Sequence, residues 1–294
     1  DDVPQYLAEW KPLHSVLSAT VYAELKAQRR GAAPSSEGSL VRIAAFGDPQ
    51  YPSALADSDS AAAADPLASG RIETSPDVRL RGGLERGLFD WQALPNSRWE
   101  VEEIARLFPE GARVYLGAEA TEERAKSVGG EAQILHFATH GHVDDRLPLS
   151  SAVALTIPSD WTPGRDNGLL QVWEILERVR LDADLVVLSA CATALGQARG
   201  GEGLVGLTRA FQYAGARSVA ASLWNVADST TAALMTRFYR HLQAGKTKDE
   251  ALRQAQVDLI RGPIEVRSES GSRQAIDASA PYYWAAFQVF GDWR

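Results

Sequence analysis

The sequence predicts an α/β fold with a mostly parallel central sheet and helices on both faces. Along most of the 294 residues, short apolar runs of strand length alternate with longer segments of helical periodicity. Gly, Pro, Ser and Asp separate many of these segments, as expected for connecting turns. At 45% hydrophobic and 23% charged residues, the chain has the composition of an ordinary globular protein, and its length suits one large or two modest domains.

The amino-terminal part differs from the rest. Residues 1 to about 30 carry a helical pattern of apolar side chains, and the sequence GAAPSSEG at 31–38 is a turn-rich linker. We therefore expect the first 38 residues to be a helical lead-in, the end of a truncated upstream region, and residues 39–294 to form the main domain. The run LVRIAAF at 40–46 predicts the first strand, and the poorly patterned stretch 49–95 predicts long surface excursions.

Beyond residue 95 the alternation is regular. Ser97 and Glu100 have the spacing of a capping box, so a helix is expected to begin at Ser97. The helices are expected at 97–108, 121–128, 169–179, 202–215, 229–245 and 247–260. The strands are expected at 113–117, 134–139, 152–156, 185–190, 218–224 and 287–291. In such sheets, ligands bind beyond the carboxyl ends of the strands.

Two of these strand ends carry reactive side chains in equivalent positions. His140 follows the apolar run ILHFAT, and Cys191, the chain's one cysteine, follows LVVLSA. If the two strands are neighbours, the imidazole and the thiol face each other over one edge of the sheet. A thiol is only a few per cent thiolate near neutral pH, so it needs a nearby imidazole to act as a nucleophile. From pattern alone, a small buried cysteine is an equally good interpretation.

The other histidines and the glycines suggest no cofactor. His136 alternates inward within its strand and is expected to be a packed, hydrogen-bonded histidine, whereas His142 is expected on a loop. His136 and His140 have a metal-binding spacing only on a helix, and Phe137 replaces the glutamate of a zincin. The stretch GEGLVG at 201–206 matches a dinucleotide motif, but a loop separates it from the preceding strand. We therefore expect neither a metal nor a cofactor.

The net charge and the hydropathy of the chain limit its possible binding partners and its cellular location. The net charge of −8 argues against nucleic-acid binding, which needs a basic face. No apolar run reaches the roughly 18 residues of a membrane span, and no signal peptide is recognisable at the start. One cysteine without an internal partner fits a reducing compartment, so a cytoplasmic location is expected.

Several longer motifs include or accompany the two strand ends: HFATHG (136–141), LSACATALG (188–196), GEGLVGLTRAF (202–211), AGARSVAASLWNVAD (214–228) and PYYWAAFQVFGDW (281–293). Together these segments resemble the CHAT family, caspase-like peptidase domains related to separases and caspases. The resemblance covers roughly residues 40 to 294. It implies a caspase–hemoglobinase-like three-layer sandwich and a cysteine endopeptidase.

The resemblance also implies roles for individual residues. His140 would be the general base, Cys191 the nucleophile, and the backbone N–H groups of Gly141 and Cys191 the oxyanion hole. Asp228 matches the position of an acidic residue that selects arginine in separases, which predicts cleavage after Arg or Lys. An equally good interpretation is that Asp228 caps the helix beginning near Ser229. Glu202 is a weaker candidate for substrate contact.

The biological setting is likewise implied by the resemblance alone. It predicts cleavage of a partner protein, gasdermin-like or another effector, in a regulated bacterial defence or cell-death pathway. The activator would be an upstream sensor or repeat region. Two alternatives stay open: a catalytically inert caspase-like module that binds proteins, and a hydrolase of small molecules that uses the same dyad.

Overall fold

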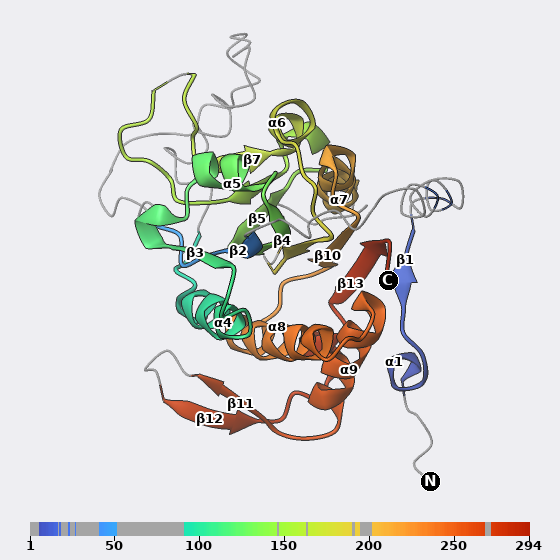
Figure 1. The fold of residues 1–294 in the computed structure, drawn as a ribbon. Coiled ribbons are helices and arrows are strands. Elements are labelled where there is room, and N and C mark those ends of the chain that lie inside the picture. The colour runs from blue at the N-terminus through green and yellow to red at the C-terminus, as the bar shows by residue number, and fades with distance from the viewer. Residues whose placement is uncertain are drawn as a thin grey trace.

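The chain is described by a computed structural model for residues 6–16, 18, 23, 27, 41–51, 91–145, 147–162, 164–189, 192–194, 202–267 and 272–294. A seven-stranded sheet forms its centre, with strand order β1-β13-β10-β8-β4-β2-β3 (Figure 1). Its strands are β1 (His14–Ser15), β2 (Val41–Gly47), β3 (Ala112–Leu116), β4 (Ala132–Ala138), β8 (Leu185–Leu188), β10 (Ser218–Ser222) and β13 (Phe287–Gly291). The five strands from β10 to β3 are parallel, and β13 pairs antiparallel with β10. The predicted fold class is confirmed.

Helices cover both faces of this sheet. The described α-helices are α1 (Leu7–Trp10), α4 (Pro95–Arg106), α5 (Glu122–Val128), α6 (Val172–Arg178), α7 (Glu202–Ala214), α8 (Asp228–Gln243), α9 (Lys248–Ile260) and α10 (Pro281–Trp284). In Figure 1, α5, α6 and α7 lie on one side of the sheet, and α4, α8 and α9 lie on the other. Among the described residues, no helix is both long enough and apolar enough to cross a membrane.

The alternation of side chains along β2 explains the three layers. Ile43 and Ala45 pack into the core beneath α4, α8 and α9, whereas Ala44 and Phe46 pack into the core beneath α5, α6 and α7. Successive residues of a strand point to opposite faces, so a strand covered on both faces must be apolar throughout. The nearly continuous apolar runs of the sequence follow from this requirement.

Gly215 fixes the passage from α7 to β10. Its φ of 123° is one that residues with a side chain rarely adopt, and a Cβ at this position would overlap the Leu181 carbonyl oxygen. The close approach allows the Leu181 N–H to donate to the Ala214 carbonyl at 2.7 Å. As predicted, this glycine closes the helix, and it also seats α7 against the chain that enters β8.

A second, smaller sheet lies at the carboxyl ends of the central strands. Its strands are β5 (His140–Val143), β6 (Ala152–Ala154), β7 (Leu169–Gln171) and β9 (Ala192–Ala194), in the order β7-β6-β5-β9. The segment 169–179 was expected to be entirely helical, but its first three residues form β7 and the helix begins at Val172. A separate hairpin, β11 (Ile264–Arg267) with β12 (Arg273–Ile276), packs beside α8.

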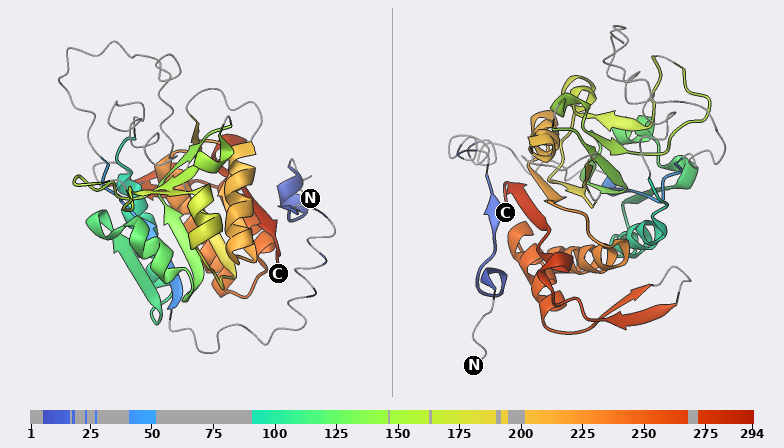
Figure 2. Two further views of the ribbon diagram at one scale, coloured as in Figure 1. Left: turned by 90° about the horizontal axis from the view of Figure 1, so that it is seen from above. Right: turned by 180° about the vertical axis from the view of Figure 1, so that it is seen from behind.

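The amino-terminal segment departs from the predicted continuous helix. Within residues 6–16, helix α1 lasts one turn and is followed by β1, which pairs parallel with β13 through His14 and Val289. Figure 2 shows β1 beside β13, with the carboxyl terminus close by. The predicted boundary after residue 38 falls outside the described residues and stays a prediction.

Candidate active site

The two strands that precede His140 and Cys191 are neighbours in the central sheet. β4 pairs parallel with β8, with Phe137 opposite Leu188, and the Ser189 N–H donates to the Phe137 carbonyl at 2.9 Å. Farther on, β5 pairs parallel with β9, with Gly141 opposite Ala192. The described backbone on both sides of residues 190–191 therefore pairs with the segment that carries His140. Cys191 and the side chain of Glu202 lie outside the described residues.

The His140 imidazole is held in one tautomer. Its Nε2 lies 2.8 Å from the Gln92 carbonyl oxygen, which can only accept, so Nε2 carries the hydrogen and donates it. Nδ1 is then the unprotonated nitrogen, and it is buried without a hydrogen-bond partner among the described residues. The side chain is 7% exposed, and this burial lowers the pKa of His140, while the Gln92 carbonyl acts in the opposite direction. At neutral pH the ring is therefore a neutral base.

Two aromatic side chains far apart in sequence surround this imidazole. The Tyr51 hydroxyl accepts the His140 N–H at 3.1 Å and donates to the Ala154 carbonyl at 3.0 Å. The ring centroids of Tyr51 and Trp91 lie 5.3 Å and 6.3 Å from that of His140, with Trp91 stacked on it. Burial raises the pKa of Tyr51 well above its ordinary value, so the phenol stays a neutral donor.

Sequence reasoning missed both aromatic residues, because they stand near the ends of the stretch 49–95 that was expected to form surface excursions. Trp91 is instead buried against the second sheet, together with Ala152 and Ala154. Isolated aromatic residues in a poorly patterned stretch were the available signal.

Replacing Tyr51 with phenylalanine keeps the ring but removes both hydrogen bonds of its hydroxyl group. We expect the free energy of unfolding to fall by about 1–3 kcal/mol, because the His140 N–H and the Ala154 carbonyl lose their partner in a buried place. Urea denaturation measures this loss. Tyr213→Phe is the control, since Tyr213 is 75% exposed. Equal stability of the two variants would show that the Tyr51 hydroxyl does not support His140.

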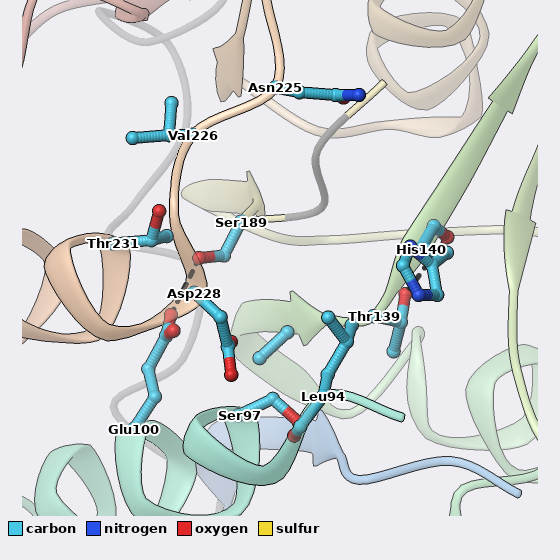
Figure 3. Close-up of a pocket in the computed structure, with 11 residues that line it drawn as sticks. Leu94, Ser97, Glu100, Thr139, His140, Ser189, Asn225, Val226, Asp228 and Thr231 are labelled. Atoms are coloured by element: carbon cyan, nitrogen blue, oxygen red, sulfur yellow. Dashed lines mark hydrogen bonds between the residues drawn. The ribbon is translucent and has the colours of Figure 1, made fainter. Parts of the chain in front are cut away.

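A cavity of about 180 Å³ opens beside His140 (Figure 3). Its lining combines apolar side chains with two carboxylates, those of Asp228 from α8 and Glu100 from α4. The lining residues are Leu94, Ser97, Glu100, Ala138, Thr139, His140, Ser189, Asn225, Val226, Asp228 and Thr231. The predicted base and the predicted specificity residue, His140 and Asp228, thus line one cavity.

Asp228 does not have the capping role considered for it. It is itself the first residue of α8, whose cap position is Ala227. Its Oδ2 instead accepts the backbone N–H of Asn96, in the first turn of α4, at 2.8 Å. Burial raises the pKa of Asp228 to about 6; the Asn96 N–H works against this shift, and the negative charge of Glu100 adds to it.

The network around Glu100 accounts for His136. Glu100 Oε1 lies 2.9 Å from His136 Nε2 and accepts the Ser189 hydroxyl at 2.6 Å. The other ring nitrogen of His136 lies 3.1 Å from the Tyr239 hydroxyl, and the histidine is 0% exposed. The prediction of a packed, hydrogen-bonded histidine is confirmed. Glu100 is bonded within this network, so the predicted capping box is wrong.

The start of α4 and the place of His142 also correct the sequence-based predictions. The helix begins at Pro95, and Ser97 Oγ accepts the Asp48 N–H at 2.8 Å while donating to the Leu94 carbonyl. His142 is not on a loop: it is buried within β5, opposite Ala152 of β6. Burial lowers its pKa. A strand of His and Gly residues escapes recognition because its pattern is not apolar.

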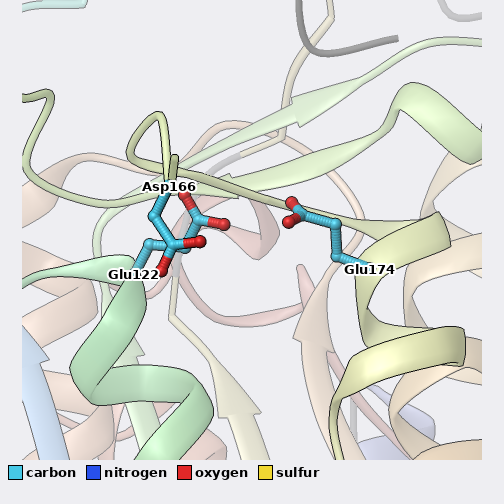
Figure 4. Close-up of side chains that lie close together, drawn as sticks. All are labelled: Glu122, Asp166 and Glu174. Carbon is cyan, nitrogen blue, oxygen red and sulfur yellow. The ribbon is translucent and has the colours of Figure 1, made fainter. Parts of the chain in front are cut away.

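A second group of acidic side chains, Glu122, Asp166 and Glu174, does not line this cavity. Figure 4 shows how the three carboxylates lie together. The three carboxylates surround the Lys126 ammonium, at N–O distances of 2.5, 2.9 and 2.7 Å. Glu122 also accepts the N–H groups of Asn167 and Gly168. The Lys126 ammonium occupies the position between the three carboxylates and neutralises part of their negative charge. We therefore interpret the group as a structural ion cluster that joins α5, α6 and the loop before β7.

Comparisons with known proteins agree with the motifs. The chain is 28% identical to mouse tetratricopeptide repeat protein 28 over 297 residues, which cover 90% of this chain and 10% of that protein. It is also 28% identical to the human protein of that name over 230 residues, 68% of this chain and 8% of that protein. The chain thus spans about a tenth or less of the length of these relatives.

Among solved structures, a pyridoxal kinase from Staphylococcus aureus aligns with 86% of this chain and 98% of its own, at 11% identity and a TM-score of 0.31. A likeness this weak supports no conclusion about the fold or the activity. The CHAT domain description, in contrast, matches residues 1–292. The chain therefore belongs to the CHAT domain family and has the fold of its caspase-like peptidases.

Proposed function

We propose that this domain is a cysteine endopeptidase whose dyad is His140 and Cys191. The observation that carries the proposal is the state of His140: the Gln92 carbonyl holds the ring with Nε2 protonated, and the buried Nδ1 has no partner in the described part of the chain. A second observation supports it. Ser189 and Ala192, on either side of residues 190–191, pair with Phe137 and Gly141 on either side of His140.

The proposed reaction is acyl transfer through a thioester. His140 Nδ1 accepts the thiol proton of Cys191 as Sγ attacks the scissile carbonyl, and then gives it to the leaving amine. Water then hydrolyses the acyl-enzyme, with the same nitrogen as the base. Because burial lowers the pKa of His140, the resting pair is a neutral imidazole with a thiol rather than an ion pair. The N–H groups of Gly141 and Cys191 are proposed to bind the oxyanion.

The cavity supports a preference for a basic residue before the cut. Asp228 and Glu100 give it negative charge, and Leu94, Ala138 and Val226 give it apolar walls that suit an aliphatic stem. Asp228 is the proposed S1 residue, with Glu202 as a weaker candidate. Its pKa of about 6 implies that the preference weakens below that pH, where the carboxylate takes up a proton beside Glu100, Asp48 and His140.

Mapping of new amino termini tests the proposal directly. We expect the native chain, added to a host lysate, to produce cuts after Arg or Lys that Cys191→Ala does not produce. Asp228→Ala should weaken the basic preference without removing the dependence on Cys191. No Cys191-dependent cut would contradict the peptidase. Cuts after Asp, or a basic preference unchanged in Asp228→Ala, would contradict the role of Asp228.

The proposed cellular setting is based on the CHAT family and on the relatives of this chain. The substrate is a partner protein, gasdermin-like or another effector, cut in a regulated cytoplasmic pathway of bacterial defence or cell death. The relatives are named for tetratricopeptide repeats and are at least about ten times longer than the matched segment. A repeat region outside this chain is accordingly the proposed sensor or activator.

A further inference from the structure

Glu100 presents a second carboxylate to the cavity beside His140. It lies on α4 and is 1% exposed, yet it lines the same cavity as Asp228 of α8 (Figure 3). The His136 ring and the Ser189 hydroxyl both bond to Oε1, while Oε2 makes no hydrogen bond with the described residues. Two hydrogen bonds therefore fix the carboxylate and leave one oxygen for a ligand.

The negative charges of the two carboxylates that line the cavity repel each other. The negative charge of Glu100 opposes ionisation of both Asp228 and Tyr239, and so contributes to the raised pKa of each. The described residues lining the cavity include neither lysine nor arginine. A cation entering it would meet two negative groups that come from different helices.

We propose that Glu100 is a second specificity-determining residue, and that the cavity takes an arginine side chain with Glu100 and Asp228 on either side of the guanidinium. This inference rests on the function proposed above. Arginine fits better than lysine because its planar group offers five N–H donors in a fixed fork, which can serve two carboxylates at once. Lysine presents a single compact charge that one carboxylate satisfies.

Ligand binding tests this without any turnover. The probes are Nα-acetyl-arginine amide and Nα-acetyl-citrulline amide, which have similar shapes and differ in charge. They are titrated by calorimetry at pH 7.5 into Cys191→Ala, which keeps the cavity but not the proposed nucleophile. We expect the arginine amide to bind more tightly, by about ten- to a hundredfold for each carboxylate that contacts it.

Single variants in the Cys191→Ala background then assign the preference. With Asp228→Asn, Glu100 alone should keep a preference for the arginine amide of about tenfold or more. With Glu100→Gln, the preference should fall by a similar factor, since glutamine still offers an oxygen to His136 and Ser189 but no charge. The double variant should bind the two amides equally.

Two outcomes would overturn the role of Glu100: equal binding of the two amides by the Asp228→Asn variant, or an unchanged preference in Glu100→Gln. If Glu100→Gln does not fold, the Asp228→Asn measurement alone decides. A chain that shows the expected binding but cuts no protein would retain this cavity assignment and disprove the peptidase, so the two failures are distinguishable.

Discussion

Replacing His140 with alanine is expected to lower kcat/KM for peptide cleavage by about 10²- to 10⁴-fold. Without the imidazole, the Cys191 thiol has no acceptor for its proton during attack. The rate of alkylation by iodoacetamide at pH 6.5 gives a second measurement that needs no substrate, and it should fall in the same variant.

The matched control is His241→Ala. His241 is hydrogen-bonded to Asp258 at 2.9 Å on the surface formed by α8 and α9, and it does not line the cavity. Its loss should change neither rate. If His140→Ala alkylates and cleaves as fast as the native chain, His140 is not the base. An inert thiol in the native chain would favour the alternative of a protein-binding module without turnover.

Removing the charge of Lys126 is expected to cause the largest loss of stability. In Lys126→Met, three neighbouring carboxylates lose their shared cation, and two of them, Glu122 and Glu174, are buried. Breaking a buried ion pair on one side costs about 3–5 kcal/mol, since the remaining charge is left uncompensated. Urea unfolding at pH 8 measures the loss. Lys246→Met, at an exposed lysine, should change stability by less than about 0.5 kcal/mol.

The loss should depend on pH in a defined direction. Burial, with the charge of Glu174 adding to it, raises the pKa of Glu122 to about 8, far above its value in the unfolded chain. Between about pH 4.3 and 8 the folded state therefore binds more protons, so stability falls as pH rises. Without Lys126 this fall should steepen, and the variant should approach the native chain near pH 5. A difference between the two chains that is constant from pH 5 to 8 would contradict this account.

The central sheet was predictable because each buried strand had to be apolar on both faces. The runs ending before His140 and Cys191 are long enough to be recognised, and the parallel order then places their ends at one edge. Whether the two strands are neighbours was left open by the sequence, and the structure shows that β4 pairs with β8. His136 was also predictable, because its place in the alternation points it into the layer beneath α4 and α8.

The rest of the candidate site depends on contacts between distant segments, which leave little local signal. Tyr51 and Trp91 meet at His140 although 40 positions separate them, and the Gln92 carbonyl that orients the ring is a backbone group. Glu100 has the spacing of a helix cap, but the buried His136 and Ser189 provide it with donors inside the molecule. Local propensity is a weak guide where tertiary partners of this kind compete.

The second sheet escaped prediction for a related reason. Its strands have only three or four residues, and β5 contains two histidines and a glycine. Such a segment becomes a strand through its partners β6 and β9 rather than through its own preference. This pairing also buries His142, which sequence reasoning placed on a loop.

The packing at Gly215 bears on how inactivating substitutions in this domain are interpreted. Any side chain at Gly215 would collide with the backbone of Leu181, and the positive φ of residue 215 would be strained. Gly215 itself does not line the cavity. A mutational scan scored by activity would therefore rank Gly215 alongside the dyad. Measuring the amount of folded protein for each variant would separate residues that carry out chemistry from those that hold two segments in contact.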